Sequence, residues 1–210
     1  MFSKLVKFIR TPSPARVRVG VFGVMLLAAV AGLIASFALI LDEFQLQNDP
    51  HAILSCSINV VLNCSTVMQT WQSHILGFPN MIIGLMAFPV VITFALASLA
   101  GVKFPRWWLI LANCAFVVDL LFSYWLFEQS VYSIQVLCPW CLVVTTATTL
   151  IFSSMLHFNL KQNTFKFAKK TNDRVQRFLS GGYHQMIVLG WLAFMIILVF
   201  VKFGAALFAQ

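Results

Sequence analysis

The chain has 210 residues, of which 60% are hydrophobic and only 10% are charged, and its mean hydropathy is +0.90. Soluble domains average about 45–50% apolar and about 25% charged residues, so the composition excludes an ordinary soluble protein and indicates an integral membrane protein. The net charge of +8 would suit a nucleic-acid-binding protein, but the placement of the basic residues argues against that partner class, as shown below.

Residues 1–18 form a polar, basic segment that we expect to lie in the cytoplasm. The apolar run at 19–41 is too long for a cleaved signal segment and is predicted to be a retained transmembrane helix, because about 20 apolar residues cross the hydrocarbon core. Four further apolar runs predict more transmembrane helices, at residues 81–100, 107–127, 138–158 and 185–208.

The predicted fold is therefore an all-α integral membrane protein, a four-helix transmembrane bundle with a fifth transmembrane helix. Residues 19–158 form the core, with an outer loop at 42–80. A basic linker at 159–184 then leads to the fifth helix within 185–210. Short connections between the second, third and fourth helices predict that these three are antiparallel neighbours.

The basic residues predict the orientation of these helices. With the N-terminus in the cytoplasm, every Lys and Arg except Lys202 lies on the inner side, and the outer loops carry acidic residues without basic ones. This distribution follows the positive-inside rule. The positive charge then faces inner-leaflet phospholipids, so we expect membrane lipid and no nucleic acid as a partner.

Four of the five cysteines fall on the predicted outer side, where disulfides persist. Cys56 and Cys64 lie in the outer loop, and Cys138 and Cys141 lie at the outer end of the fourth helix. Cys114, in the third helix, is expected to pack as a small buried hydrophobe.

The sequence Cys138-Pro139-Trp140-Cys141 opens the fourth helix. Cys138 is expected near the N-cap and Pro139 at the first helical position, which tolerates proline. The positive end of a helix lowers the pKa of nearby thiols, so the pair suits redox chemistry. A structural disulfide and half of a metal site are the alternatives. Four cysteines around zinc usually come as two closely spaced pairs, and only one pair is closely spaced here, so no metal is expected.

The outer loop contains two further features. A continuous helix would hold Cys56 and Cys64 about 12 Å apart, so a disulfide between them would require a turn, which Asn59 and Asn63 favour. Within 67–77 the apolar residues recur at helical spacing, which predicts a short amphipathic helix. This helix would serve as a surface anchor, as a lid over a cavity in the bundle, or as both.

The order of these motifs resembles the vitamin K epoxide reductase family in its bacterial form, over about residues 19–158. The motifs are Cys56 and Cys64 in the first outer loop, Asn63-Cys64-Ser65, Phe78-Pro79-Asn80 leading into a helix with Gly84, and Cys138-Pro139-Trp140-Cys141 last. The unrelated quinone-linked oxidase DsbB carries its Cys-x-x-Cys pair in the first outer loop, whereas here it comes last.

The resemblance implies a four-helix core around a quinone, either ubiquinone or menaquinone. It implies that Cys56 and Cys64 form a shuttle pair, in which Cys56 meets the partner thiol and Cys64 exchanges with Cys138. Cys141 would face the quinone ring. Asn80 would hydrogen-bond a quinone oxygen, although its position also suits the N-cap of the second helix.

The implied function is a membrane thiol oxidase that promotes disulfide formation in exported proteins. It would pass electrons from a DsbA-like or thioredoxin-like periplasmic dithiol to a quinone in the bacterial cytoplasmic membrane. Because the chain ends at Gln210, where many bacterial relatives continue into a thioredoxin-like domain, a separate partner is expected. Thr145 stands where vertebrate members have a tyrosine, which makes plain quinone reduction more expected than epoxide reduction.

Asp119 is an ionisable residue within the third predicted helix, so it is a candidate proton relay. A buried aspartate that steadies helix packing is the alternative. For the whole chain, the alternative to an enzyme is a non-enzymatic redox sensor or scaffold with structural disulfides. A transporter is disfavoured because paired interrupted helices are lacking.

Overall fold

The computed structural model of the chain describes residues 14–49, 52, 54 and 56–207. Most of the predicted basic segment 1–18 lies outside these residues. Within them, five helices are long and apolar enough to cross a membrane, which confirms the predicted fold class. They are α2 (Pro14–Asn48), α4 (Met81–Leu99), α5 (Arg106–Glu128), α6 (Pro139–Lys161) and α8 (Tyr183–Leu207).

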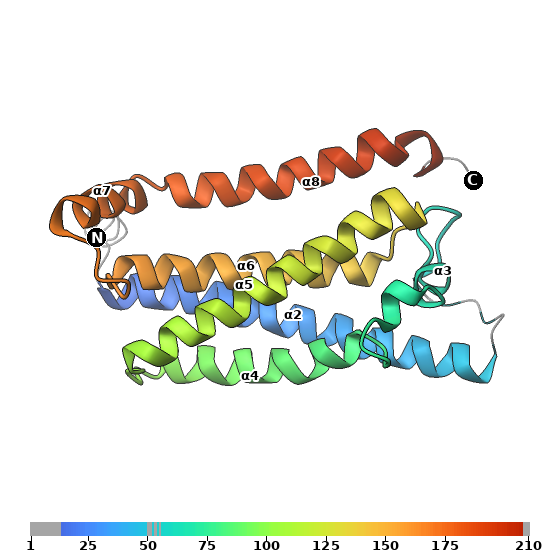
Figure 1. Cartoon of the computed structure of the whole chain (residues 1–210), viewed down its shortest axis with the longest axis horizontal. Helices are drawn as coiled ribbons and strands as arrows, with labels where there is room; N and C mark the ends of the chain where they lie inside the picture. The colour runs from blue at the N-terminus through green and yellow to red at the C-terminus, as the bar shows by residue number, and fades with distance from the viewer. Residues whose placement is uncertain (1–13, 50–51, 53, 55, 208–210) are drawn as a thin grey trace, which may run out of the picture.

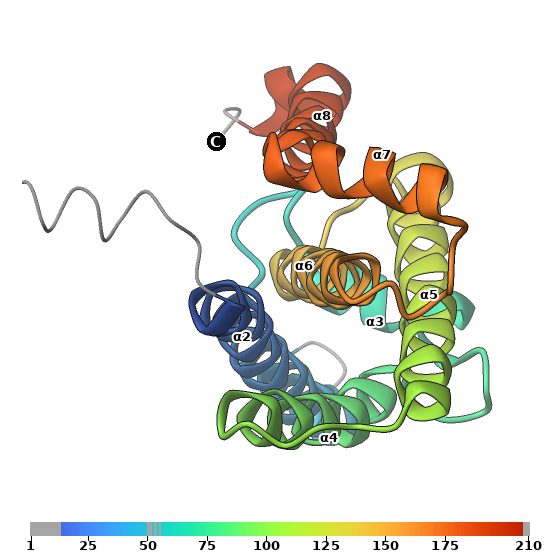
Figure 2. The same cartoon turned by 90° about the vertical axis from the view of Figure 1, so that its left-hand side faces the viewer.

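Four of the long helices form an open ring in the order α4, α2, α6, α5 (Figure 2). Helix α2 packs along both α4 and α6, and α5 packs on α6. The expectation that the second, third and fourth transmembrane helices are sequential neighbours therefore holds for α5 and α6, whereas α4 packs mainly on α2. Helix α8 lies outside the ring, beside α6 (Figure 1).

Glycines allow α2 and α4 to approach closely. A Cβ atom on Gly84 would lie 2.3 Å from the Ser36 hydroxyl, and one on Gly32 would lie 2.4 Å from the Phe88 ring. A large apolar cluster, which includes Phe22, Met25, Phe94, Ile151 and Met155, fills the half of the bundle away from the cysteine pairs. This packing holds the helices that carry the site described below.

Helix α2 is longer than the sequence predicted, because it ends at Asn48 rather than at residue 41. The extension is stabilised by burial, since Leu39, Asp42 and Leu46 are buried along one stripe of the helix. The outer loop therefore begins later than predicted, and Asp42 belongs to a helix.

The predicted amphipathic helix over 67–77 is wrong as a single element. The chain instead forms α3 (Cys64–Met68) and the 3-10 helix η1 (Trp71–His74). The Ser73 hydroxyl donates to the carbonyls of Met68 and Thr70, which tightens the chain between the two helices. Val67 and Met68 are buried while Trp71 is 68% exposed, so the segment turns part of its apolar side toward the bundle.

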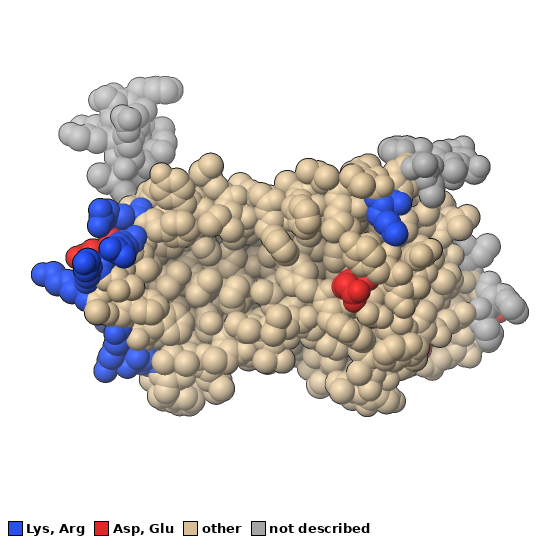
Figure 3. All heavy atoms as spheres, turned by 45° about the horizontal axis from the view of Figure 1, so that its top comes forward, with Lys and Arg blue, Asp and Glu red and all other residues tan. Residues whose placement is uncertain are grey.

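Two further connections complete the molecule. The π-helix η2 (Gln129–Ile134) continues α5 and leads to Leu137, which forms a parallel bridge with Leu62 and so joins the outer loop to the start of α6. Helix α7 (Lys169–Ser180) lies within the basic linker and crosses the ends of the long helices (Figure 2). Basic side chains gather at this end of the molecule (Figure 3).

Candidate active site

Cys56 and Cys64 form a disulfide with a Cα–Cα distance of 5.8 Å. The loop between them turns as a bond of this kind requires. Asn59 Oδ1 accepts two backbone N–H groups within the loop, and Asn63 caps α3 by accepting the N–H of Thr66. The two asparagines that the sequence singled out thus hold the turn.

The next sulfur is Cys138 Sγ, which lies 3.3 Å from Cys64 Sγ. Both residues are buried. The backbone on either side is fixed by the bridge, where Asn63 N–H donates to the Leu137 carbonyl at 3.0 Å. The two sulfurs are in contact but not bonded, an arrangement from which thiol–disulfide exchange can proceed.

Cys138 is the N-cap of α6, as the sequence predicted, and Pro139 occupies the first helical position. The Cys138 sulfur accepts a hydrogen bond from the Cys141 N–H at 3.4 Å. Hydrogen bonding from the Cys141 thiol, followed by backbone N–H groups of Cys141 and Trp140, lowers the pKa of Cys138 against the opposing effect of its burial. The geometry therefore favours Cys138 over Cys141 as the thiolate of the inner pair, which is the name used below for Cys138 and Cys141.

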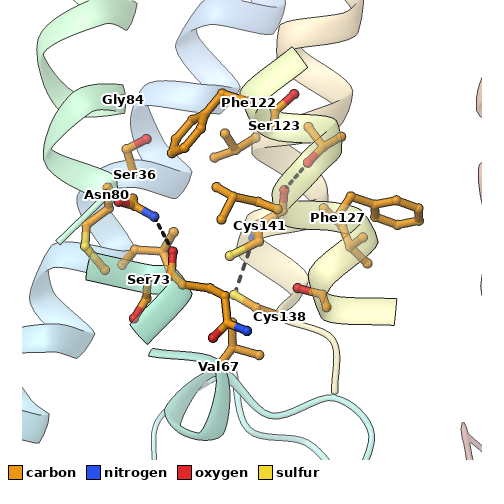
Figure 4. A pocket seen from close by; sticks show the side chains of 18 of the residues that line it. Ser36, Val67, Ser73, Asn80, Gly84, Phe122, Ser123, Phe127, Cys138 and Cys141 are labelled. Atoms are coloured by element: carbon orange, nitrogen blue, oxygen red, sulfur yellow. Dashed lines mark hydrogen bonds between the residues drawn. The ribbon is translucent and has the colours of Figure 1, made fainter. Parts of the chain in front are cut away.

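Cys141 lines a cavity of about 130 Å³ in the half of the bundle that carries the cysteine pairs (Figure 4). Helices α2, α4, α5 and α6 form its walls, and residues of α3 and η1 cover it. Figure 4 shows Asn80 and Gly84 on α4 across from Phe122 on α5 and Cys141 on α6. Val67 and Ser73 come from the covering segment, so this segment closes one side of the cavity, as the lid interpretation requires.

Asn80 does not cap α4, although it stands at the N-cap position. Its side-chain N–H group donates instead to the Gln72 carbonyl at 2.7 Å. Its Oδ1 atom is buried and has no hydrogen-bond partner among the described residues. Asn80 therefore occupies the predicted N-cap position without a capping hydrogen bond from its side chain, and the cavity contains an acceptor atom whose partner the described chain does not supply.

Three other residues from the sequence analysis are placed by the structure. Asp119 and Thr145 line the same cavity as Cys141. Cys114 is exposed on the surface of α5, so the prediction that it packs in the interior is wrong. Its position points outward because α5 packs on α6 through another face.

Sequence reasoning missed Asp42. Its carboxyl oxygen lies 3.2 Å from Cys56 Sγ, and the residue is only 6% exposed. Because the sequence predicts that the first helix ends at residue 41, Asp42 is expected in a loop, where an acidic residue is common and indicates no particular role. The helical spacing of Leu39, Asp42 and Leu46 is the signal that would have revealed a buried stripe passing through it.

A sequence model described as the vitamin K epoxide reductase family matches residues 23–156. No curated protein and no solved structure matches the chain. The matched residues contain both cysteine pairs and every residue that lines the cavity.

Proposed function

Because this chain belongs to the vitamin K epoxide reductase family, whose members are membrane redox enzymes, we propose that it is a quinone-dependent thiol oxidase. Its electrons would come from a DsbA-like or thioredoxin-like periplasmic dithiol protein. The observation that carries the proposal is the line of sulfurs from Cys56–Cys64, across 3.3 Å to Cys138, to Cys141 in the cavity wall.

The proposed relay is a series of thiol–disulfide exchanges. A partner thiolate attacks Cys56, the Cys56–Cys64 bond breaks, and Cys64 leaves as a thiolate. Cys64 then attacks Cys138 of a Cys138–Cys141 disulfide, and Cys141 leaves. After the partner has resolved from Cys56, Cys56 attacks Cys64 and releases Cys138. The bonding after this last step, with Cys56–Cys64 closed and two free thiols in the inner pair, is that of the present structure.

The lining of the cavity fits a quinone ring. Apolar side chains such as Phe88 and Phe122 surround it, and the unpartnered Oδ1 atom of Asn80 supplies a buried acceptor. An acceptor suits a hydroxyl, which is the form that a ring oxygen takes after reduction. A bound quinone supplies a sink for two electrons and two protons. Asn80 would orient the ring, Cys141 would face it, and Asp119 would hold a proton at the cavity wall.

Access for the partner requires the outer loop to open. Cys56 is only 5% exposed in this structure, within an apolar cluster that includes Leu39, Leu54 and Cys138. A partner thiolate must approach a disulfide sulfur directly to attack it. The present arrangement therefore suits the inward step of the relay, and the outward step uses a more open loop.

The proposed function also implies an orientation of the chain in the membrane. We place the basic end of the molecule, with α7, in the cytoplasm, and the cysteine pairs at the periplasmic face of a bacterial inner membrane. The positive-inside rule supports this placement, because the described basic side chains gather at one end of the bundle, except for Lys202, which lies over the Tyr132 ring (Figure 3).

A redox sensor or scaffold with structural disulfides is the second candidate. A structural role would account for Cys56–Cys64 alone, but it gives no reason for a third sulfur at 3.3 Å or for a fourth in a cavity wall. The enzyme is therefore favoured.

A purified-protein assay separates the two candidates. Reduced dithiol donor and a soluble quinone are mixed with the full chain in detergent, and quinol formation is followed. We expect turnover that Cys138→Ala and Cys141→Ala each abolish, while Cys114→Ala, the matched control, retains it. Absence of turnover in the unaltered chain, or its persistence in Cys141→Ala, would rule out the oxidase.

A further inference from the structure

The relay leaves one buried ionisable group without a role. Asp42 Oδ2 lies 3.2 Å from Cys56 Sγ, and a carboxyl oxygen of Asp42 lies within 4.8 Å of both Cys56 Sγ and Cys64 Sγ. The carboxyl is therefore at the outer end of the sulfur line, opposite the cavity.

Its surroundings give the carboxyl no cation to pair with. Asp42 is buried beside the apolar cluster that contains Leu39, Leu46 and Cys56. Among the described residues, the ion-pair contact joins His74 to Glu43. No basic side chain of these residues pairs with Asp42. The groups that face it are the disulfide sulfurs of Cys56 and Cys64, which can ionise only after reduction, and, farther away, the free thiol of Cys138. An unpaired carboxylate is unfavourable in such a place.

The redox state of Cys56 determines whether the proton shared with Asp42 lies on the carboxyl or on the sulfur. A disulfide sulfur has no S–H group, so Cys56 cannot donate to Asp42 in the present state. The contact at 3.2 Å is a hydrogen bond only if the proton is on the carboxyl. When Cys56 is reduced, the same pair of atoms can share that proton with the thiol as the donor.

From this geometry we propose that Asp42 is the acid–base group of Cys56, an inference that rests on the proposed relay. When the partner resolves from Cys56, the S–S bond between them breaks and the departing Cys56 sulfur takes the proton of the Asp42 carboxyl. When Cys56 later attacks Cys64, the proton returns to Asp42. In that step the Cys56–Cys64 bond forms, the Cys64–Cys138 bond breaks, and Cys138 leaves with the electron pair.

The prediction concerns the lifetime of the Cys64–Cys138 disulfide. Without a base, Cys56 remains a thiol near neutral pH and attacks slowly, because the thiolate is the nucleophile. A positioned acid–base group is typically worth about 10²–10⁴-fold in rate. We therefore expect Asp42→Asn to accumulate the Cys64–Cys138 disulfide and to slow its decay about a hundredfold or more.

The experiment needs no quinone. The full chain with both pairs oxidised is mixed with one equivalent of reduced dithiothreitol, quenched with acid at intervals and digested, and the Cys64–Cys138 peptide is quantified by mass spectrometry. In Asp42→Asn the decay rate should rise with pH up to the range of an ordinary cysteine thiol, whereas in the unaltered chain it should level off at lower pH. Glu128→Gln makes the same chemical change at an exposed outer residue and should leave the decay unaltered.

The outcomes separate this inference from the proposed function. Equal decay rates and equal pH profiles for Asp42→Asn and the unaltered chain would overturn the role of Asp42, even if quinol forms normally. Slow decay in Asp42→Asn together with no quinol formation by the unaltered chain would support the role of Asp42 and refute the quinone step. If Asp42→Asn fails to form the Cys56–Cys64 disulfide at all, Asp42→Glu, which retains the carboxyl, must restore the rapid decay or the proposal fails.

Discussion

Asp119 lines the cavity on the α5 side, where the chain lies within a membrane-spanning helix. Quinone reduction consumes two protons, and a carboxyl at the cavity wall can deliver one of them. Asp119→Asn keeps the size of the side chain but cannot hold an exchangeable acidic proton. We expect this variant to slow quinol formation about a hundredfold or more, the lower end of the range for loss of general acid catalysis.

The control for Asp119→Asn is the decay of the Cys64–Cys138 disulfide, measured by the same acid-quench method without quinone. In that step Cys56 attacks Cys64 and Cys138 leaves, so Cys141 in the cavity wall takes no part and the rate should not change. Normal quinol formation by Asp119→Asn would leave Asp119 with a packing role only.

The lowered pKa of Cys138 predicts how the rate of thiol–disulfide exchange depends on pH. Hydrogen bonding from Cys141 lowers the pKa of Cys138, so its thiolate forms at a lower pH than that of an ordinary cysteine. Exchange through Cys138 should therefore be sustained at pH values where an ordinary thiol is protonated, and it should be lost as the pH falls through the lowered pKa. Because the folded state binds the proton more weakly, the shift stabilises folding above the unfolded pKa, and this contribution is lost over the same fall.

This titration can be read from the ultraviolet absorbance of the thiolate in a Cys114→Ala background, with Cys56–Cys64 oxidised. Cys141→Ala removes the principal hydrogen bond and should move the midpoint to higher pH. A first midpoint at or above that of a model cysteine would contradict the assignment of Cys138 as the thiolate.

At the scale of residues, the sequence predicted the four sulfurs and Asn80 because their spacing is local and matches a known pattern. It could not predict that the Asn80 side chain bonds to Gln72 instead of capping α4. It also could not predict the partner of Asp42, because the contact with Cys56 depends on how far α2 extends.

Helices α2 and α4 are in close contact at Gly84, and this contact shapes one wall of the cavity. In Gly84→Ala the new methyl group would lie 2.3 Å from the Ser36 hydroxyl. Overpacking of this kind typically costs about 1–3 kcal/mol. We expect a lower midpoint of thermal unfolding in detergent, measured by circular dichroism.

Two further variants test the cause of that loss. Gly23→Ala lies on α2, the helix that carries Ser36, meets no atom within 4 Å and should leave the midpoint unchanged or raise it slightly. Adding Ser36→Ala to Gly84→Ala removes the hydroxyl and leaves a contact of 3.2 Å, so part of the stability should return. Full stability of the single Gly84→Ala variant would show that the two helices have room to move apart.

The loop at 57–63 is the element nearest the disulfide on the outer face. Val60 is 86% exposed and Ile58 is 68% exposed, so two apolar side chains stand beside Cys56 without cover from the described chain. If a protein partner docks here, the double variant Ile58→Ser and Val60→Ser should raise the KM for that partner while leaving turnover with a small dithiol unchanged. Equal effects on both donors would place the docking surface elsewhere.

At the scale of elements, hydropathy predicted all five long helices, since burial in lipid imposes a minimum apolar length. It failed at 67–77, where side-chain hydrogen bonds of Ser73 divide the segment into two short helices. Hydropathy also failed at the end of α2 near Asn48. There Leu39 and Leu46 pack in the apolar cluster that contains Cys56 and Cys64, so the helix is stabilised by tertiary contacts instead of by lipid.

At the scale of the whole molecule, the order of helices around the ring depends on contacts that connection lengths do not reveal. Helix α4 packs on α2 although a short connection joins it to α5, and the cavity occupies the space enclosed by the four helices. The charge pattern of the sequence, by contrast, predicted a basic end of the molecule that Figure 3 displays. Apart from Lys202, which lies over the Tyr132 ring, the described basic side chains are therefore separated from the sulfur-bearing end of the bundle.

The most direct test of the account follows the order in which the two pairs are oxidised. The full chain is reduced at all five cysteines under nitrogen, mixed with one equivalent of quinone, quenched at intervals with acid and analysed by mass spectrometry. The account predicts that the Cys138–Cys141 disulfide appears first and is then replaced by Cys56–Cys64. In Cys141→Ala neither disulfide should form. Formation of Cys56–Cys64 before Cys138–Cys141, or in the absence of Cys141, would contradict it.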